Sequence, residues 1–355
     1  SMASRFSPVA ITSWVGPRRC TARPTSACAN RILSSYNTST ASHIEGTLEP
    51  DQMFDLAKKN NIQIPFKSIE DVKNAYNFNN LESFLKIYYE SAKVLVKEQD
   101  FFDLTWAYAL KCKEDNIVHT EIFFDPQTHI ERGINFDVII NGIYNALRKA
   151  EQKFGLSFKI IMCFLRHLDE SPCFKILDQA ILHKEKIFGV GLDSSEIGNP
   201  PRKFKRLFKK ALENNFITVA HAGEEGPPEY IWEALKLLNV KRIDHGVQCI
   251  KDKKLVAELI KTQIPLTICP LSNIKLKVFK TLKEHNLKKM LDLNLMVMVN
   301  SDDPAYFGGY LNQNLIEIHQ ALRLSRSEIK KLIVNSFKSS FLTEIQKKEW
   351  INKIK

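Results

Sequence analysis

Short runs of β-branched and aromatic residues alternate with amphipathic helical patterns along most of this 355-residue chain. The runs occupy residues 117–124, 158–165, 187–192, 216–221, 242–246, 265–269 and 295–300. Apolar residues at helical spacing precede them or lie between them, at residues 50–60, 81–97, 136–154, 203–214, 230–238 and 254–261. Such alternation predicts parallel strands that are buried on both faces, in an open sheet or in a closed barrel.

An eighth strand near residues 36–43 would complete a (β/α)8 barrel, the TIM-barrel arrangement. The helical patterns at 50–60 and 81–97 predict extra helices between the first and second strands, and the last 35 residues predict further helices at the C-terminus. The expected fold class is therefore α/β, with residues 41–355 forming one barrel domain.

The first 40 residues differ in composition from the predicted barrel. Residues 1–44 contain five arginines and no lysine, and carry +5 of the formal net charge of +11. An arginine-rich, serine-rich and acid-poor start is typical of an organellar transit segment, although Pro8 and Pro17 would interrupt its helix. We expect residues 1–40 to be a non-core extension, either a targeting segment or an atypical gene start.

Composition also excludes several classes of protein. No stretch approaches the roughly 18 apolar residues that a membrane helix needs, so we expect no contact with a membrane. The positive charge beyond residue 44 is spread over lysine-rich helical faces, which favours solvated surface over binding to nucleic acid. Seven scattered cysteines indicate a reducing compartment. We expect a cytoplasmic protein, or a mitochondrial or plastid one if residues 2–40 are a transit peptide; the oligomeric state stays open.

Polar residues stand where three of the predicted strands end. His221 and Glu224 follow one strand, Asp244 and His245 end the next one, and the triplet 301–303 (Ser-Asp-Asp) follows the last. Each of these groups alone could be a turn or a hydrogen-bonded core residue. Because the carboxyl ends of parallel barrel strands meet on one face, the groups should converge there. Imidazole and carboxylate are the usual ligands of catalytic zinc, so the pattern predicts metal-assisted hydrolysis.

Seven motifs in this order resemble the adenosine/adenine deaminase family of metal-dependent amidohydrolase barrels, and in particular its adenine deaminase branch. They are HIEGTLEP (43–50), EIFFDPQTH (121–129), GLDSSE (191–196), HAGEEGPP (221–228), DHG (244–246), CPLSN (269–273) and SDDPAYFGG (301–309). The resemblance runs from about His43 to about Asn314. It implies conversion of adenine to hypoxanthine and ammonia, in purine salvage.

The resemblance also implies the roles of individual residues. His43, His221 and Asp302 would hold one Zn2+ per chain, which supplies hydroxide at neutral pH. Glu224 would protonate the ring nitrogen beside the reacting carbon, and His245 would position the attacking hydroxide. The small-molecule purine would be the only partner.

Two further carboxyl groups bear on substrate recognition. Asp303, in its protonated form, would hydrogen-bond the imidazole nitrogen of the purine, since that nitrogen is an acceptor. Glu196 stands where the adenosine-specific branch has a glycine, and we expect its carboxylate to contact the base near N9–H or N3 and to exclude a ribose. The motif residues Glu121, Asp125 and His129 are expected to have only supporting structural roles.

One position departs from the family pattern. The family carries a His-x-His pair on the first strand and both histidines bind zinc, whereas this chain has Ala41 in place of the first histidine. Three ligands are enough in number for catalytic zinc, so we expect a folded enzyme with weakened zinc binding. The alternatives are an adenosine deaminase, or an inactive barrel that binds a purine or serves as a scaffold.

Overall fold

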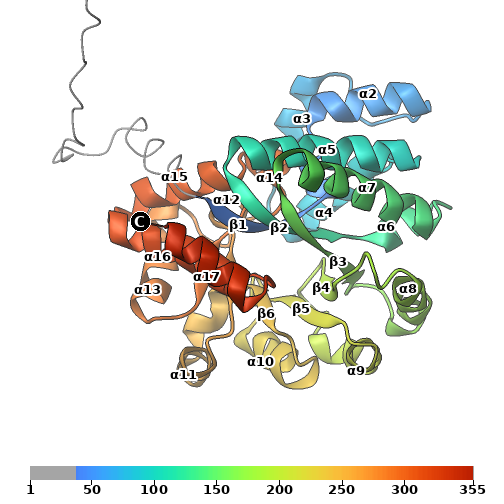
Figure 1. The fold of residues 1–355 in the computed structure, drawn as a ribbon. Coiled ribbons are helices and arrows are strands. Elements are labelled where there is room, and N and C mark those ends of the chain that lie inside the picture. Colours follow the sequence, from blue (N-terminus) through green and yellow to red (C-terminus); the bar gives the residue numbers. More distant parts are fainter. Residues whose placement is uncertain (1–36, 355) are drawn as a thin grey trace, which may run out of the picture.

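The computed structural model describes residues 37–354 of the chain. Eight parallel strands form one sheet in the order β1 to β8, and helices surround it (Figure 1). The strands are β1 (Thr38–His43), β2 (Ile117–Phe124), β3 (Ser157–Leu165), β4 (Gly189–Asp193), β5 (Ile217–Ala222), β6 (Arg242–His245), β7 (Leu266–Ile268) and β8 (Val297–Val299). The predicted (β/α)8 barrel is confirmed.

Helices follow the strands and also fill the two places where extra helices were expected. Between β1 and β2 lie η1 (Glu45–Thr47), α2 (Pro50–Asn60), α3 (Ile69–Ala75), α4 (Leu81–Ala92) and α5 (Glu98–Glu114). The segments after β2 to β5 are α6 (Pro126–Ile130), α7 (Phe136–Phe154), α8 (Glu170–Leu182), η2 (Pro201–Phe204), α9 (Lys205–Glu213) and α10 (Pro228–Leu237). The segments after β6 to β8 are η3 (Val247–Lys251), α11 (Lys253–Thr262), α12 (Pro270–Lys275), η4 (Leu282–Glu284), α13 (Leu287–Asp292), α14 (Pro304–Phe307), α15 (Leu311–Leu322), α16 (Arg326–Ser339) and α17 (Glu344–Lys353).

Strand β1 is buried although most of its side chains are polar. Side chains from other elements satisfy its backbone: the Ser39 N–H donates to Ser336 Oγ on α16 at 3.2 Å, and the Ala41 N–H donates to Asn300 Oδ1 at 2.8 Å. A polar strand is tolerated inside the barrel because these partners replace water. The barrel therefore begins at Thr38 rather than at residue 41, and the rest of the predicted extension lies outside the described residues.

The helix expected over residues 81–97 ends at Ala92, and a separate helix, α5, begins at Glu98, just beyond the expected range. The Asp100 carboxylate accepts hydrogen bonds from the backbone N–H groups of Val96 and Lys97, at 3.1 and 2.9 Å. Such bonds satisfy donors that a helix leaves free at its N-terminus, so a new helix begins at Glu98. The apolar spacing alone did not reveal this capping interaction.

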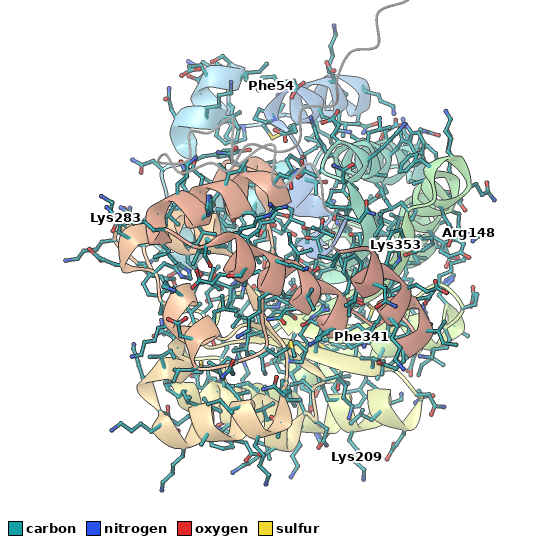
Figure 2. All side chains as sticks on the ribbon, turned by 60° about the vertical axis from the view of Figure 1, so that its left-hand side comes forward. Phe54, Arg148, Lys209, Lys283, Phe341 and Lys353 are labelled. Carbon is teal, nitrogen blue, oxygen red and sulfur yellow. The ribbon has the colours of Figure 1, made fainter. Side chains whose placement is uncertain are left out.

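The outer helices carry much of the charge of the molecule. Figure 2 shows the side chains of Lys209, Lys283 and Arg148 reaching outward from the barrel. Within the described residues no helix is long and apolar enough to cross a membrane. The five cysteines in this part of the chain are all free and buried.

Candidate active site

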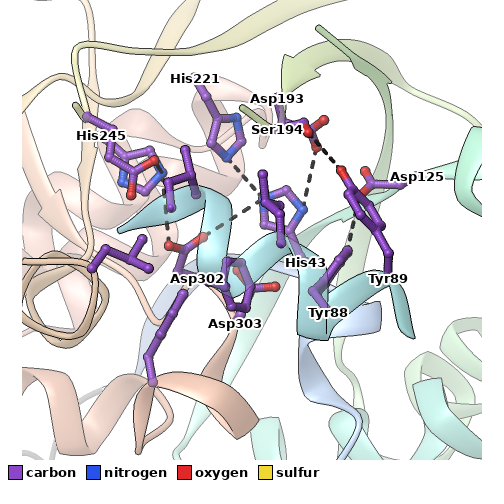
Figure 3. A pocket seen from close by; sticks show the side chains of 16 residues that line it. His43, Tyr88, Tyr89, Asp125, Asp193, Ser194, His221, His245, Asp302 and Asp303 are labelled. Atoms are coloured by element: carbon purple, nitrogen blue, oxygen red, sulfur yellow. Dashed lines mark hydrogen bonds and ion pairs between the residues drawn. The ribbon is translucent and has the colours of Figure 1, made fainter. Parts of the chain in front are cut away.

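Eight histidine and carboxyl side chains meet in one cavity at the carboxyl ends of the strands (Figure 3). The empty space of the cavity, including the part that is open to solvent, is about 380 Å³. Its lining consists of His43, Leu81, Phe84, Leu85, Tyr88, Tyr89, Asp125, Asp193, Ser194, His221, Glu224, His245, Leu276, Asp302, Asp303 and Phe307.

His43, His221 and Asp302 form a compact group of possible metal ligands. Their nearest ligand atoms all lie within 4.8 Å of one another, and Nε2 of His43 is 3.0 Å from Nε2 of His221. Two nitrogens bound to one tetrahedral zinc at roughly 2.0–2.1 Å would be separated by a little more than 3 Å. Asp302 Oδ1 lies 3.9 Å from His43 Nε2 and faces the same space. The donor set and its spacing therefore fit a metal ion.

Carboxylates stand behind the other ring nitrogen of both histidines. Asp193 Oδ2 is 3.7 Å from Nδ1 of His43, and Asp244 Oδ2 is 4.0 Å from Nδ1 of His221. A carboxylate in this position holds the imidazole ring so that its other nitrogen faces the metal. Burial, together with His43 and His245, lowers the pKa of His221 well below its usual value, so its lone pair stays available.

The pKa values of Glu224 and Asp303 are both raised, as a carboxyl group that donates a proton near neutral pH requires. Burial raises the pKa of Glu224 well above its usual value, and Asp302 and Glu196 raise it further. Burial and Asp302 raise the pKa of Asp303 in the same direction. His245 Nε2 lies 3.6 Å from Glu224 Oε2 and 4.0 Å from Asp302 Oδ2, which places the imidazole between the acid and the metal ligands. Both carboxyl groups can therefore hold a proton and donate it.

The backbone is strained where several strands deliver their side chains. Ser194, His245 and Asp302 have φ angles of 77°, 66° and 60°. Such left-handed conformations are uncommon for residues other than glycine and are concentrated at functional sites. Gly46 lets the backbone after β1 approach the Asp303 side chain closely, because a Cβ atom on residue 46 would overlap the carboxyl group of Asp303. These features aim the side chains into the cavity.

Glu196 lies elsewhere than the sequence suggested. Its carboxylate accepts hydrogen bonds from four consecutive backbone N–H groups, those of residues 223–226, at 2.6 to 3.1 Å. Glu196 is absent from the cavity lining, and a Cβ on Gly226 would collide with its carboxylate. This corrects the expected contact with the base: the Glu196 oxygens are occupied beneath the loop that carries Glu224.

Ala41 faces the barrel interior on the same side of β1 as His43. It packs against Phe123, Ile161, Cys163 and Val219 in a small apolar cluster. The neighbouring Ser42 does not replace the missing histidine as a ligand, because its Oγ lies 2.7 Å from Ser301 Oγ on the other face of the strand. Among the described residues, two further groups could also hold a metal ion: His245 with Cys269 and Asp302, and His43 with Asp125 and Asp193.

Sequence reasoning undervalued part of the cavity wall. Asp125 was expected to have only a supporting structural role and Asp193 was given none, although both stand at strand ends like the residues that were selected. Tyr88 and Tyr89 lie on α4, where their helical spacing looks like that of ordinary core residues. In the structure the Tyr88 hydroxyl donates to Asp125 Oδ2 at 3.1 Å, and Tyr89 hydrogen-bonds Ser194 at 2.7 Å.

A parallel barrel with histidine and carboxylate ligands at the carboxyl ends of its strands, beside a protonated carboxyl group, is the arrangement of a metal-dependent hydrolase. Comparison with known families narrows this class. The adenosine deaminase family matches residues 37–355, and the chain belongs to this family.

Relatives of known name and structure agree with this assignment. The chain is 57% identical over 312 residues to an adenine deaminase of Acinetobacter baylyi and to one of Wolinella succinogenes, covering 88% of this chain and 94% of each relative. The crystal structure of an adenine deaminase from Arthrobacter aurescens superposes with a TM-score of 0.88 and 44% identity, over 90% of this chain and 98% of that one. A zinc-bound amidohydrolase from Burkholderia ambifaria, 21% identical with a TM-score of 0.86, shows likeness of fold over 95% of this chain and 94% of its own.

Proposed function

We propose that this chain catalyses the zinc-dependent hydrolysis of adenine to hypoxanthine and ammonia. The observation that carries the proposal is the placement of three possible metal ligands, His43, His221 and Asp302, beside Glu224 and Asp303 in one cavity. The names of the relatives, at 54–57% identity, support adenine as the substrate. A cytoplasmic location stays a prediction, and the alternative transit segment lies outside the described residues.

Zinc is the metal that best suits two imidazoles and one carboxylate in a site with an open position. When bound, it would supply hydroxide at neutral pH for attack on the carbon that bears the amino group. His43, His221 and Asp302 would hold the ion. Asp193 would keep the His43 ring in the orientation that directs Nε2 toward it.

The residues around the metal group would handle the protons of the reaction. Glu224 would donate its proton to the ring nitrogen next to the reacting carbon, which ends the aromaticity of that ring and lets the carbon accept the oxygen. His245 would hold the attacking water by a hydrogen bond. Asp303 would donate its proton to the N7 lone pair and so fix the orientation of the base. The amino group then leaves as ammonia.

The test is adenine loss, followed by ultraviolet absorbance with added zinc, for the natural chain and for Ala41→His. We expect turnover in both, with zinc affinity higher by roughly 10- to 100-fold in Ala41→His because a ligand is restored. Zinc content after dialysis gives a readout that does not depend on turnover. Ala41→Asn, which adds polar volume but a poor zinc ligand, is the matched control.

The outcomes separate this proposal from its alternatives. Turnover in Ala41→His but none in the natural chain would overturn the proposed activity and leave an inactive purine-binding barrel. Faster turnover of adenosine than of adenine would identify an adenosine deaminase instead. Equal zinc content in the natural chain, Ala41→His and Ala41→Asn would show that position 41 does not face the metal.

A further inference from the structure

Four carboxyl groups stand in a defined order around the cavity. Asp303 has Asp302, Asp125 and Glu224 as its strongest charged neighbours. The Tyr88 hydroxyl donates to Asp125 Oδ2 at 3.1 Å and lies 3.5 Å from Glu45 Oε2. In Figure 3, His245 lies on one side of the metal ligands and Asp125, Tyr88 and Tyr89 lie on the other, with Asp303 between them. In the same view Asp302 and Asp125 lie on opposite sides of Asp303, and His245, whose Nε2 is 3.6 Å from Glu224 Oε2, lies beyond Asp302.

Asp125 is buried and retains acceptor capacity. It is 3% exposed and lies in the turn between β2 and α6. Its Oδ2 accepts from the Tyr88 hydroxyl, and its own N–H donates to Glu45 Oε1 at 3.1 Å. Its Oδ1 has no hydrogen-bond partner among the described residues. Since each carboxylate oxygen has two lone pairs, Asp125 can still accept from a ligand.

The chemistry of the base matches this order. Adenine carries its imidazole proton on N9 in its predominant tautomer, which leaves N7 as an acceptor. Around the rim of the purine, N1, C6, N7 and N9 follow in this order, which matches the placement of Glu224 beside His245, the proposed metal ligands, Asp303 and Asp125. The N9–H group then faces the next acceptor beyond Asp303, which is Asp125.

We propose that Asp125 accepts the hydrogen bond from N9–H of bound adenine and thereby selects the free base over purines substituted at N9. The inference rests on the proposed deaminase function and names the residue that decides its substrate class. A nucleoside has no proton at N9, so it would leave the buried carboxylate without this partner. Its ribose would also meet the tightly packed group of Asp125, Tyr88 and Glu45.

This assignment replaces the discriminating role first expected of Glu196. The oxygens of Glu196 are taken up by four backbone N–H groups, whereas Asp125 lines the cavity and its Oδ1 has no backbone donor. Asp125 is not one of the three proposed zinc ligands, although with His43 and Asp193 it forms a second group that could hold a metal ion, and it is not needed to deliver a proton. It would act on specificity by contact with the substrate.

The experiment compares kcat/KM for adenine and for 9-methyladenine, which differ at N9 alone by a hydrogen or a methyl group. We expect the natural chain to prefer adenine strongly, and Asp125→Ala to lower this preference by roughly 10- to 100-fold through loss of the acceptor for N9–H. Asp125→Asn keeps the volume of the side chain and should lower it as well. Asp169→Asn, an exposed acid at the start of α8, is the matched control and should leave the ratio unchanged.

Binding measurements keep the test independent of turnover. Dissociation constants for adenine and 9-methyladenine, measured by calorimetry on the same zinc-loaded variants, should show the same loss of preference. An unchanged ratio in both Asp125 variants, with normal circular dichroism, would overturn the inference. Absence of turnover in the natural chain would instead overturn the proposed function, and the binding ratio would still decide the role of Asp125.

Discussion

At the scale of single residues, one buried carboxylate organises the loop that carries the proposed acid. Glu196 accepts from the backbone N–H groups of residues 223–226, and Arg166 Nη1 lies 4.0 Å from its Oε1. Arg166 also donates to the carbonyl oxygen of His221 at 2.6 Å, so the Glu196–Arg166 pair also contacts the backbone of a proposed metal ligand. Charge-assisted hydrogen bonds of this kind are roughly twice as strong as neutral ones. The position of Glu224 thus depends on a residue outside the cavity.

Replacing Glu196 with glutamine should therefore reduce kcat more than it changes KM. The amide of glutamine keeps one acceptor but directs an NH2 group at backbone donors, which would displace the loop. Since misplacement by about 1 Å can cost on the order of 100-fold, we expect kcat to fall by roughly 10- to 100-fold. Steady-state kinetics over a range of pH checks this, because a displaced Glu224 should also shift the alkaline limb of the profile.

Glu225→Gln is the control for Glu196→Gln. Glu225 belongs to the same loop, but its side chain accepts only from the Leu81 N–H, at 2.9 Å. A much smaller effect on kcat is expected there. Equal losses in the two variants would show that Glu196 has no special part in positioning Glu224.

At the scale of elements, a side chain completes the hydrogen bonding where the barrel closes. Strands β8 and β1 are joined by a single bridge between Ser42 and Asp302, and the His43 N–H donates to the Asp302 carbonyl at 3.1 Å. Asn300 Oδ1 takes the place of a strand partner for Ala41, and the Thr40 hydroxyl donates to the same oxygen at 3.4 Å. Asn300 therefore holds β1, and with it the ligand His43, against β8.

Asn300→Ala should loosen β1 locally. The Ala41 N–H would be left buried without a partner, which typically costs about 1–3 kcal/mol. We expect a lower free energy of unfolding by that amount, and faster hydrogen exchange of the amides of residues 38–43 than of the other strands. Urea denaturation measures the free energy of unfolding, and mass spectrometry of peptides during hydrogen exchange measures the exchange of residues 38–43.

Asn335→Ala provides the comparison for that variant. Asn335 donates to the Val297 carbonyl at 2.9 Å and so joins α16 to β8 rather than to β1. Its loss should destabilise the protein without selectively exposing residues 38–43. If β1 exchanged equally in the two variants, Asn300 would not be the closing contact.

At the scale of the whole molecule, a buried histidine far from the metal group makes stability depend on pH. His285 lies before α13, and its Nδ1 accepts from the Leu287 N–H at 3.0 Å while Nε2 lies 3.1 Å from Asn273 Oδ1. This pairing requires the neutral ring. Burial accordingly lowers the pKa of His285 from 6.5 to about 3.

The unfolded chain binds a proton at His285 below pH 6.5, whereas the folded chain does so only near pH 3, so stability falls as pH drops through this window. Between pH 7 and pH 5 the loss from His285 should be about 2 kcal/mol. His285→Gln retains a donor toward Asn273 and does not titrate. Urea denaturation of both proteins at pH 7 and pH 5 measures the difference; parallel losses in the two would contradict the assignment to His285.

The sequence itself determined the order of strands and helices, since apolar periodicity is a local property of the chain. It also predicted the residues at the ends of β5, β6 and β8, because a polar group after a buried strand stands out from its neighbours. The family resemblance added the roles of those residues. The helix break before Glu98 was missed, because it depends on one capping side chain rather than on periodicity.

Only the tertiary structure decided which of the many acids enter the cavity. Glu196 and Asp125 both stand close to strand ends, but backbone N–H groups from a distant loop surround the first, whereas a tyrosine from α4 turns the second toward the cavity. The burial of the polar β1 likewise depends on Asn300 and Ser336, more than 250 residues away in the chain. Such contacts join segments that no local pattern connects, because they form only after the barrel has closed.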